Sequence, residues 1–179
     1  MACRFNNFCV LLRPKHDKMT EYPALNLPEA RLPLRESGGR WQVLCLLRQR
    51  WVRLTPEEWV RQHFCRYLVS GLGYPRTLLA NEQQLSVGEK RLRCDTVLYD
   101  RHLRPRMIVE YKAPTVPVTE QVFRQVVAYN IVLHADYLVV SNGLTHYCCQ
   151  MDYAGGHHRF LTAIPPYATI AQKESVAGS

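Results

Sequence analysis

The sequence predicts an α/β domain in which a central mixed β-sheet is flanked by helices. Three observations support this fold class. A helical pattern of apolar residues is followed by three segments of period two, a second helical pattern and one or two short strands. The chain has 179 residues, which suits one domain of ordinary size. Apolar residues make up 47% and charged residues 21%, as in a globular protein with a real core.

The chain divides into three expected parts. Residues 1–21 are an extension that is either disordered or a misassigned start, because residues 1–18 are basic and show no clear periodicity, and Met19 offers a later start. Residues 22–165 form the folded domain. Residues 166–179, which contain Pro, Ala and Ser, are expected to be a flexible tail.

The first elements follow a proline-rich lead-in. Trp41–Cys45 and Arg50–Leu54 are expected to pair as a β-hairpin. The clearest helix start in the chain comes next: Thr55 is a good N-cap and Pro56 suits the first helical position. Apolar residues then recur at helical spacing until Gly71.

The remaining elements alternate between the two periods. We expect strands near 78–87, 91–99 and 106–113, turns at Gly88-Glu89 and Asp100–Pro105, a helix over 119–133, and strands at Tyr137–Ser141 and His146–Asp152. A strand, a helix and then a further strand favour a mixed sheet with helices packed on it.

Composition and charge exclude some classes of protein and favour one kind of partner. No window approaches the run of about eighteen apolar residues that a membrane helix needs, and no secretory signal is recognisable, so a cytoplasmic protein that does not bind membranes is expected. Seven cysteines without framework spacing indicate reduced thiols. The formal net charge of +8 suits a polyanion such as nucleic acid. A modest basic bias that keeps a small domain soluble explains the charge equally well.

Three charged residues are predicted to converge on one strand pair. The turn at Asp100–Pro105 is centred midway between Asp95 and Glu110, so a regular hairpin places these two carboxylates almost opposite each other. Lys112 lies two residues beyond Glu110 and therefore projects from the same face. Facing carboxylates repel and are costly among apolar residues unless they are paired or bind a metal ion.

This arrangement has two interpretations. Two carboxylates suit Mg²⁺, which keeps several waters, and the nearby ammonium of Lys112 can orient a metal-bound water and stabilise charge on a phosphate. Alternatively the strands face solvent, and Glu110 simply pairs with Lys112 or a nearby arginine. Spacing alone somewhat favours the second interpretation.

The order of these residues resembles a nuclease signature. Asp95 followed by Glu110-Tyr-Lys112 is similar to the D…(D/E)-x-K pattern of PD-(D/E)xK metal-dependent nucleases. A helix beginning Thr55-Pro-Glu-Glu-Trp precedes it, and the 119–133 helix follows with Gln125 and Tyr129 as a Q-x-x-x-Y pair. Together with Val139-Val-Ser-Asn-Gly and neighbouring segments, roughly residues 20–165 resemble stand-alone proteins similar to the N-terminal nuclease domain of the restriction subunit of type I restriction–modification systems.

The resemblance implies a fold, a reaction and a set of site residues. It implies a restriction-endonuclease-like core and Mg²⁺-dependent hydrolysis of DNA phosphodiester bonds, for which Mn²⁺ is expected to substitute. By motif position, Asp95 and Glu110 are metal ligands and Lys112 is the catalytic lysine. Gln125 and Tyr129 lie one helical turn apart, suited to touching the site or the DNA backbone, although a helix-surface or packing pair would look the same.

An acidic residue on the first helix often completes the site in this family. Glu57 shares an apolar stripe with Val60 and Phe64, so it is the preferred third metal ligand. Glu58 stands three residues after Thr55, where a capping box gives it a structural role, and the choice between the two stays open. Cys94 replaces the proline of the family name, which is not counted against activity.

Two further groups are weaker candidates. Five arginines flank the proposed site and are candidates for phosphate contacts, or else form a solvated hairpin face: Arg91, Arg93, Arg101, Arg104 and Arg106. A cluster of histidines and cysteines fits no standard zinc spacing and is expected to be structural: His146, Cys148, Cys149, His157 and His158.

The predicted function is therefore that of a metal-dependent DNA endonuclease domain. The chain has no Gly-rich phosphate loop, so ATP-driven translocation would need a translocase or other restriction subunits as partners, and a homodimer is a further possibility. The alternative is a catalytically silent DNA-binding or accessory module of a restriction or repair complex with the same fold.

Overall fold

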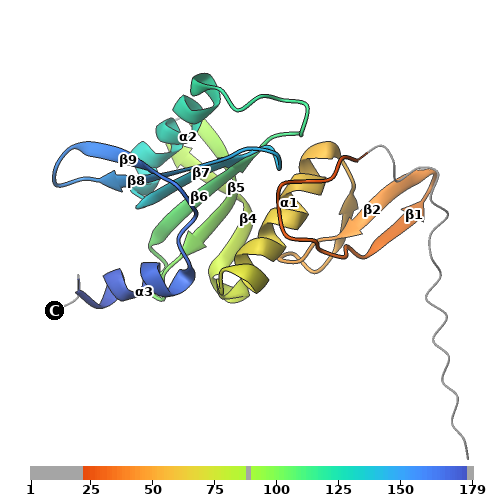
Figure 1. The fold of residues 1–179 in the computed structure, drawn as a ribbon, viewed down its shortest axis with the longest axis horizontal. Helices are drawn as coiled ribbons and strands as arrows, with labels where there is room; N and C mark the ends of the chain where they lie inside the picture. Colours follow the sequence, from red (N-terminus) through yellow and green to blue (C-terminus); the bar gives the residue numbers. More distant parts are fainter. Residues whose placement is uncertain (1–21, 88–89, 177–179) are drawn as a thin grey trace, which may run out of the picture.

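The computed structural model describes residues 22–87 and 90–176. These residues form a mixed six-stranded sheet, an antiparallel three-stranded sheet and three α-helices (Figure 1). The larger sheet has six strands in the order β4-β5-β6-β7-β8-β9. All neighbours in it are antiparallel except β6 and β7, which are parallel. The strands are β4 (Leu79–Val87), β5 (Lys90–Tyr99), β6 (Pro105–Tyr111), β7 (Tyr137–Ser141), β8 (His146–Asp152) and β9 (His157–Leu161).

Helices cover both faces of this sheet. Helix α1 (Pro56–Arg66) packs Val60 and Phe64 on one face. On the other face, α2 (Glu120–Leu133) packs Val126 and forms the crossover that a parallel β6–β7 pair requires. The α/β class and mixed sheet predicted from the sequence are thus confirmed.

The smaller sheet lies on the other side of α1 from the six-stranded sheet (Figure 1). Its order is β1-β2-β3, and both pairings are antiparallel. The strands are β1 (Leu34–Ser37), β2 (Arg40–Leu44) and β3 (Trp51–Arg53). The predicted hairpin corresponds to β2 and β3, whereas β1 was not expected from the proline-rich lead-in.

The C-terminal region differs from the expected flexible tail over 166–179. Residues Tyr167–Val176 form helix α3, and Ile170 is fully buried among core residues of the α1 face. The Tyr167 amide donates to the Leu72 carbonyl at 2.9 Å, and the Tyr74 hydroxyl donates to the Pro165 carbonyl at 2.7 Å. The burial of Ile170 and these long-range hydrogen bonds order the segment. The local amino-acid composition does not predict such contacts. The predicted extension at 1–21 lies outside the described residues.

Two expected absences concern the described residues alone. Among them, no helix combines the length and apolar character that crossing a bilayer requires. Cys148 and Cys149 are both buried and pack on opposite faces of the sheet, as adjacent strand residues must. Among the described residues, no group of three or more His, Cys, Asp or Glu side chains is placed to hold a metal ion.

Candidate active site

Strands β5 and β6 bring the two predicted carboxylates together. Thr96 pairs with Val109, so Asp95 comes opposite Glu110 one position further along the hairpin. At this point the Tyr111 amide of β6 donates to Asp95 Oδ2 at 2.9 Å, so a side-chain carboxylate on β5 accepts this hydrogen bond. Both side chains are buried, with Asp95 6% and Glu110 5% exposed. The predicted register is confirmed at this pair of strands.

Lys112 meets Glu110 just past the end of β6. Its Nζ donates to Glu110 Oε1 at 3.0 Å, and its backbone amide continues the pairing with β7 through the Ser141 carbonyl. Within the described residues, Glu110 Oε2 has no hydrogen-bond partner although it is buried. Desolvated carboxylate oxygens are costly without a partner, so this oxygen is a natural ligand for a cation.

The first turn of α1 adds two further carboxylates. Thr55 caps the helix as predicted, because its Oγ1 accepts from the Glu58 amide at 3.1 Å. Glu57 is half-buried and lies close enough to Asp95 and Lys112 for their charges to affect its pKa, and its own charge raises the pKa of Glu110. The Glu58 carboxylate does not turn back to cap the helix; it accepts from arginine side chains on its inner side.

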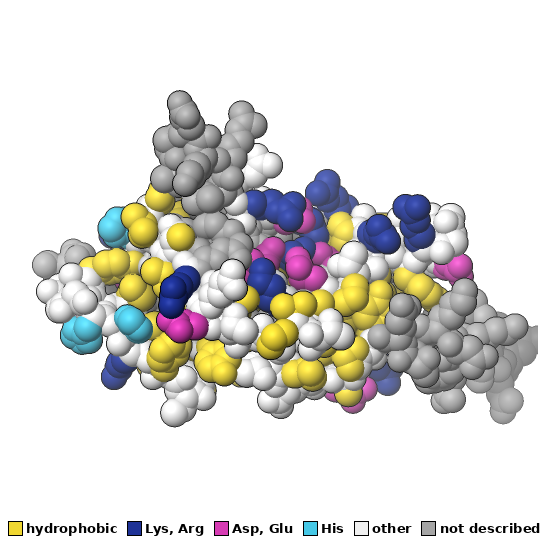
Figure 2. Space-filling view, turned by 90° about the horizontal axis from the view of Figure 1, so that it is seen from above, with side chains coloured by type: hydrophobic (Ala, Val, Ile, Leu, Met, Phe, Trp, Pro, Cys, Tyr) yellow, Lys and Arg dark blue, Asp and Glu magenta, His cyan; other side chains and the backbone are white. Residues whose placement is uncertain are grey.

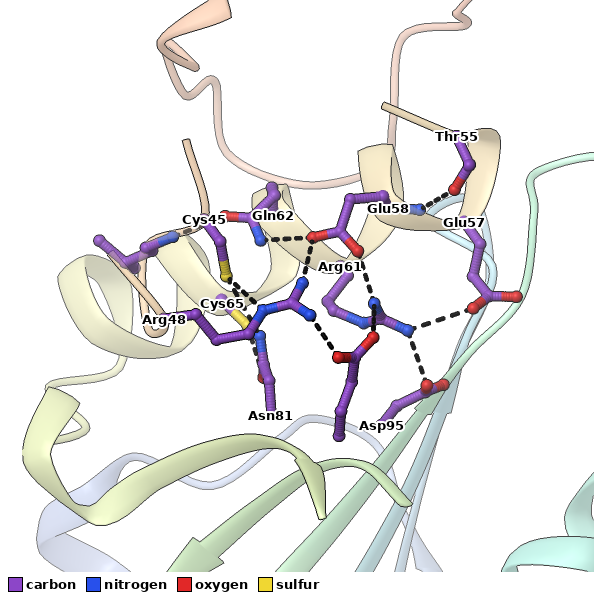
Figure 3. A network of polar contacts seen from close by, with 12 residues as sticks. Cys45, Arg48, Thr55, Glu57, Glu58, Arg61, Gln62, Cys65, Asn81 and Asp95 are labelled. Carbon is purple, nitrogen blue, oxygen red and sulfur yellow. Dashed lines mark hydrogen bonds and ion pairs between the residues drawn. The ribbon is translucent and has the colours of Figure 1, made fainter. Parts of the chain in front are cut away.

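Arg61 connects these acidic side chains at the centre of the network in Figure 3. Its Nη2 donates to Asp95 Oδ1 at 2.7 Å and to Glu57 Oε1 at 3.1 Å, while Nη1 donates to Glu58 Oε2 at 2.5 Å. The guanidinium is only 3% exposed, and it lies 5.7 Å from the centre of the Tyr111 ring. Arg61 therefore supplies positive charge to a buried group of carboxylates.

A second arginine extends the network away from the strand ends. Arg48 contacts Glu58 Oε1 at 3.2 Å and also pairs with Glu82 on β4. Its Nε donates to Cys45 Sγ at 3.2 Å, which together with other hydrogen bonds lowers the thiol pKa although burial alone would raise it (Figure 3). Arg48 and Arg61 together balance the acidic residues that α1 and β4 bury.

The charges of the site shift one another's pKa values. Burial and the nearby Asp95 carboxylate together raise the pKa of Glu110 to about 7, although Lys112 opposes the shift. Burial and Asp95 also raise the pKa of Glu57. Burial by itself lowers the pKa of Lys112, but the hydrogen bond with Glu110 and the nearby carboxylate charges together outweigh it, so the net shift is upward. Lys112 is therefore an ammonium at neutral pH.

The donor set fits a hard cation with few protein ligands. Within the described residues, no group of three or more His, Cys, Asp or Glu side chains is arranged to hold a metal ion. Mg²⁺ needs only one or two carboxylates and keeps waters in its other positions. Glu110, with its unpartnered Oε2, and the opposing Asp95 meet this requirement, with Glu57 nearby. These residues would hold the ion.

The stability of the protein is expected to fall between about pH 5 and pH 8 because of Glu110. Its ordinary pKa of 4.5 is raised to about 7 by burial, by Asp95 and by Glu57 against the opposing Lys112, so the folded state binds this proton more tightly. The stability that protonated Glu110 contributes is fully present below its pKa in the unfolded chain. It is lost as the pH rises through the pKa of Glu110 in the folded protein. Urea unfolding should show that wild type loses on the order of 3 kcal/mol of stability over this pH range, and that Glu110→Gln does not show this loss.

An exposed carboxylate provides the control for this titration. Glu120→Gln on α2 removes an acid whose side chain is 80% exposed and should keep the wild-type pH profile. Identical profiles for Glu110→Gln and wild type would contradict the assignment.

Other predicted residues fall outside this cluster. Gln125 and Tyr129 lie on α2, and their side chains lie outside the described part of the structure. Arg91 is likewise undescribed at its side chain, while Arg93 is exposed and acts electrostatically on Glu57.

The expectation that all five hairpin arginines flank the site is wrong for the three nearest the turn. Arg101 and Arg104 lie in the β5–β6 turn, about 16 Å along the strand from Glu110. Arg104 pairs with Asp100 at 2.7 Å, and Arg106 is buried against Asp136 at 2.6 Å. These three arginines are close to the motif in sequence, but they lie at the turn end of the hairpin, far from the end that carries Glu110.

Arg61 and Glu82 are the site residues that sequence reasoning did not single out. Arg61 stands four residues after Glu57 and four before Cys65, on the side of α1 that faces the sheet. A charged residue on the side of the helix that faces the sheet was the feature of the sequence that could have indicated its role. Glu82 has a left-handed φ of 55° in β4, and no pattern in the sequence indicated it.

Comparison with known proteins gives one family match and one similar solved structure. The sequence profile of the family described as type I restriction enzyme R protein N terminus (HSDR_N) matches residues 56–165, which run from α1 past β9. A solved fragment described as part of an HsdR subunit of a type I restriction enzyme from Vibrio vulnificus YJ016 is 20% identical, with a TM-score of 0.48. The match covers 66% of this chain and 25% of that one, so the chain spans about a quarter of the fragment's length. No curated protein matches the chain.

Proposed function

Since the chain belongs to the type I restriction enzyme R protein N-terminus family, we propose that it is a nuclease domain that hydrolyses DNA phosphodiester bonds with Mg²⁺. The observation that carries the proposal is the group formed by Asp95, Glu110 and Lys112, where the end of β6 lies beside the middle of β5. Two buried carboxylates and an ammonium in one place suit phosphoryl chemistry.

Each residue has a defined part in the proposed reaction. When bound, Mg²⁺ would supply an activated water and neutralise charge on the scissile phosphate. Glu110 and Asp95 would hold the ion, and Glu57 is the proposed third ligand from α1. Lys112, held at 3.0 Å from Glu110, is placed to stabilise negative charge that develops on the phosphate. Gln125 and Tyr129 are proposed, from the family resemblance, to contact the site or the DNA backbone.

Cutting in a restriction complex would require more than this chain. A translocase or other restriction subunits are proposed partners, and a homodimer could place two sites on opposite strands. The competing proposal is an accessory module that binds DNA without turnover. It is favoured by the ion pair of Arg61 with Asp95, which holds one of the two ligand carboxylates.

Metal-dependent cleavage distinguishes the two proposals. Purified protein incubated with supercoiled plasmid, or with single-stranded DNA, is expected to cut in Mg²⁺ or Mn²⁺ and not in EDTA. Conversion of supercoiled to nicked and linear plasmid on a gel measures the rate. Intact plasmid under every metal condition, with DNA binding retained, would replace the nuclease by the accessory module.

A further inference from the structure

The three-stranded sheet has one face that carries arginines. Residues along a strand alternate between faces, and residues opposite one another on neighbouring strands share a face. Arg35 pairs with Gln42, and Gln42 pairs with Arg53, so these three side chains form one row across β1, β2 and β3. Arg40, two residues before Gln42, and Trp51, two before Arg53, lie on the same face.

The opposite face of the sheet is the one that packs against the protein. It contains Leu34, Val43 and Val52, which are register partners, and Val43 is fully buried. The arginine face therefore points outward, and Arg35, Arg40 and Arg53 are all exposed. Glu36 alternates with Arg35 and belongs to the other row.

The composition of this segment is strongly one-sided. Between residues 31 and 53 the chain has one acid, Glu36, against six arginines: Arg31, Arg35, Arg40, Arg48, Arg50 and Arg53. Arg48 is used by the buried network around Glu58. Neither Arg40 nor Arg53 makes an ion pair with any carboxylate in the described ranges 22–87 and 90–176, so their charges face solvent.

Arg35 is held in a defined orientation. Its Nε donates to Gln42 Oε1 at 2.8 Å, and its guanidinium lies 4.3 Å from the centre of the Trp51 ring. These contacts use Nε and one flat side of the group, while no described residue accepts from its two terminal nitrogens. A guanidinium presented in this way suits bidentate contact with a phosphate.

We propose that this arginine face binds the phosphate backbone of DNA beside the candidate active site. Arg35 and Arg53 are two strand spacings apart, about 10 Å, so they can reach separate phosphates of one duplex. Figure 2 shows Lys and Arg side chains on the same side of the molecule as the central acidic cluster, continuing toward the end where β1 and β2 lie. The sheet precedes residues 56–165, so the family match does not account for it.

The location beside the active site rests on the proposed nuclease function, but DNA binding by the face does not. The test measures binding of a labelled duplex of about 30 bp by fluorescence anisotropy in EDTA, over a series of salt concentrations. Combining Arg35→Gln, Arg40→Gln and Arg53→Gln should weaken binding about tenfold or more and lower the slope of log affinity against log salt by roughly 2 to 3.

Two control variants show whether the effect on DNA binding is specific to the arginine face. Combining Arg101→Gln, Arg124→Gln and Arg159→Gln removes three exposed charges elsewhere and should leave the slope near that of wild type. Combining Arg35→Lys, Arg40→Lys and Arg53→Lys keeps the charge and should retain most of the slope, which separates lost contacts from a lost fold. Equal slopes for the two glutamine triple variants would overturn the proposal.

Cleavage is scored separately from binding. A wild-type protein that fails to cut plasmid but whose binding depends on the arginine face refutes the nuclease and supports the surface. Normal cleavage with unchanged binding by the Arg35, Arg40 and Arg53 variant refutes the surface alone.

Discussion

Replacing Lys112 by glutamine is expected to lower the rate of metal-dependent DNA cleavage by about 100-fold or more, with the fold and DNA binding retained. The ammonium hydrogen-bonds Glu110, and in the proposed reaction it stabilises negative charge on the phosphate. Glutamine can still donate a hydrogen bond to Glu110 but carries no charge. Single-turnover cleavage of plasmid, at saturating Mg²⁺, measures the effect.

Glu110→Gln should lower the rate of DNA cleavage at least as much as Lys112→Gln does, for a different reason. It keeps the shape of the side chain and removes the charge from the buried Oε2 that is proposed to bind the ion. Adding more Mn²⁺ should therefore recover part of the activity of Glu110→Gln and none of that of Lys112→Gln.

The control for both variants is an exposed arginine at the far end of the hairpin. Arg101→Gln also removes one positive charge, and it should cut at the wild-type rate. Wild-type cleavage by Lys112→Gln and Glu110→Gln would move the active site elsewhere in the chain, whatever the family resemblance implies.

Replacing Arg61 by leucine is expected to reduce the free energy of unfolding by about 3–5 kcal/mol. Glu58 and Asp95 are almost fully buried, and Arg61 pairs with both, so its removal leaves buried charges without their partner. This loss is a large part of the stability of an ordinary domain, about 5–15 kcal/mol. Urea unfolding followed by circular dichroism measures it.

The same kind of pair on α2 provides the control. Like Arg61 and Glu57, Arg124 and Glu120 are four residues apart on a helix, but their side chains are 75% and 80% exposed, so Arg124→Leu should cost less than about 1 kcal/mol. Should Arg61→Leu fail to fold at neutral pH, Arg61→Lys keeps the charge and allows the comparison. The loss should shrink in acid, where protonated carboxylates need no partner; a loss independent of pH would indicate a packing defect instead.

Much of the fold followed from neighbouring residues. The cap at Thr55, the periodicity of α1 and the strands near 79–111 are local properties, and the structure confirms them. A short turn determines which residues of a hairpin face each other, so the predicted pairing of Asp95 with Glu110 also needed only local information. Two strands and one α-helix were missed. Strands β1 and β9 pair with their chain neighbours β2 and β8 across short turns, whereas α3 depends on distant contacts such as that of Tyr167 with Leu72.

The sequence by itself therefore determined the mixed α/β fold and the meeting of Asp95, Glu110 and Lys112 on one strand pair. Only the tertiary structure decided that Arg61 enters this cluster, since its partner Asp95 is 34 positions away and packing of α1 on the sheet brings them together. Likewise, only the pairing of three strands separates the arginines of β1–β3 from Glu36 onto one exposed face. Periodicity and capping act between near neighbours, whereas burial and charge pairing act between residues that folding alone makes adjacent.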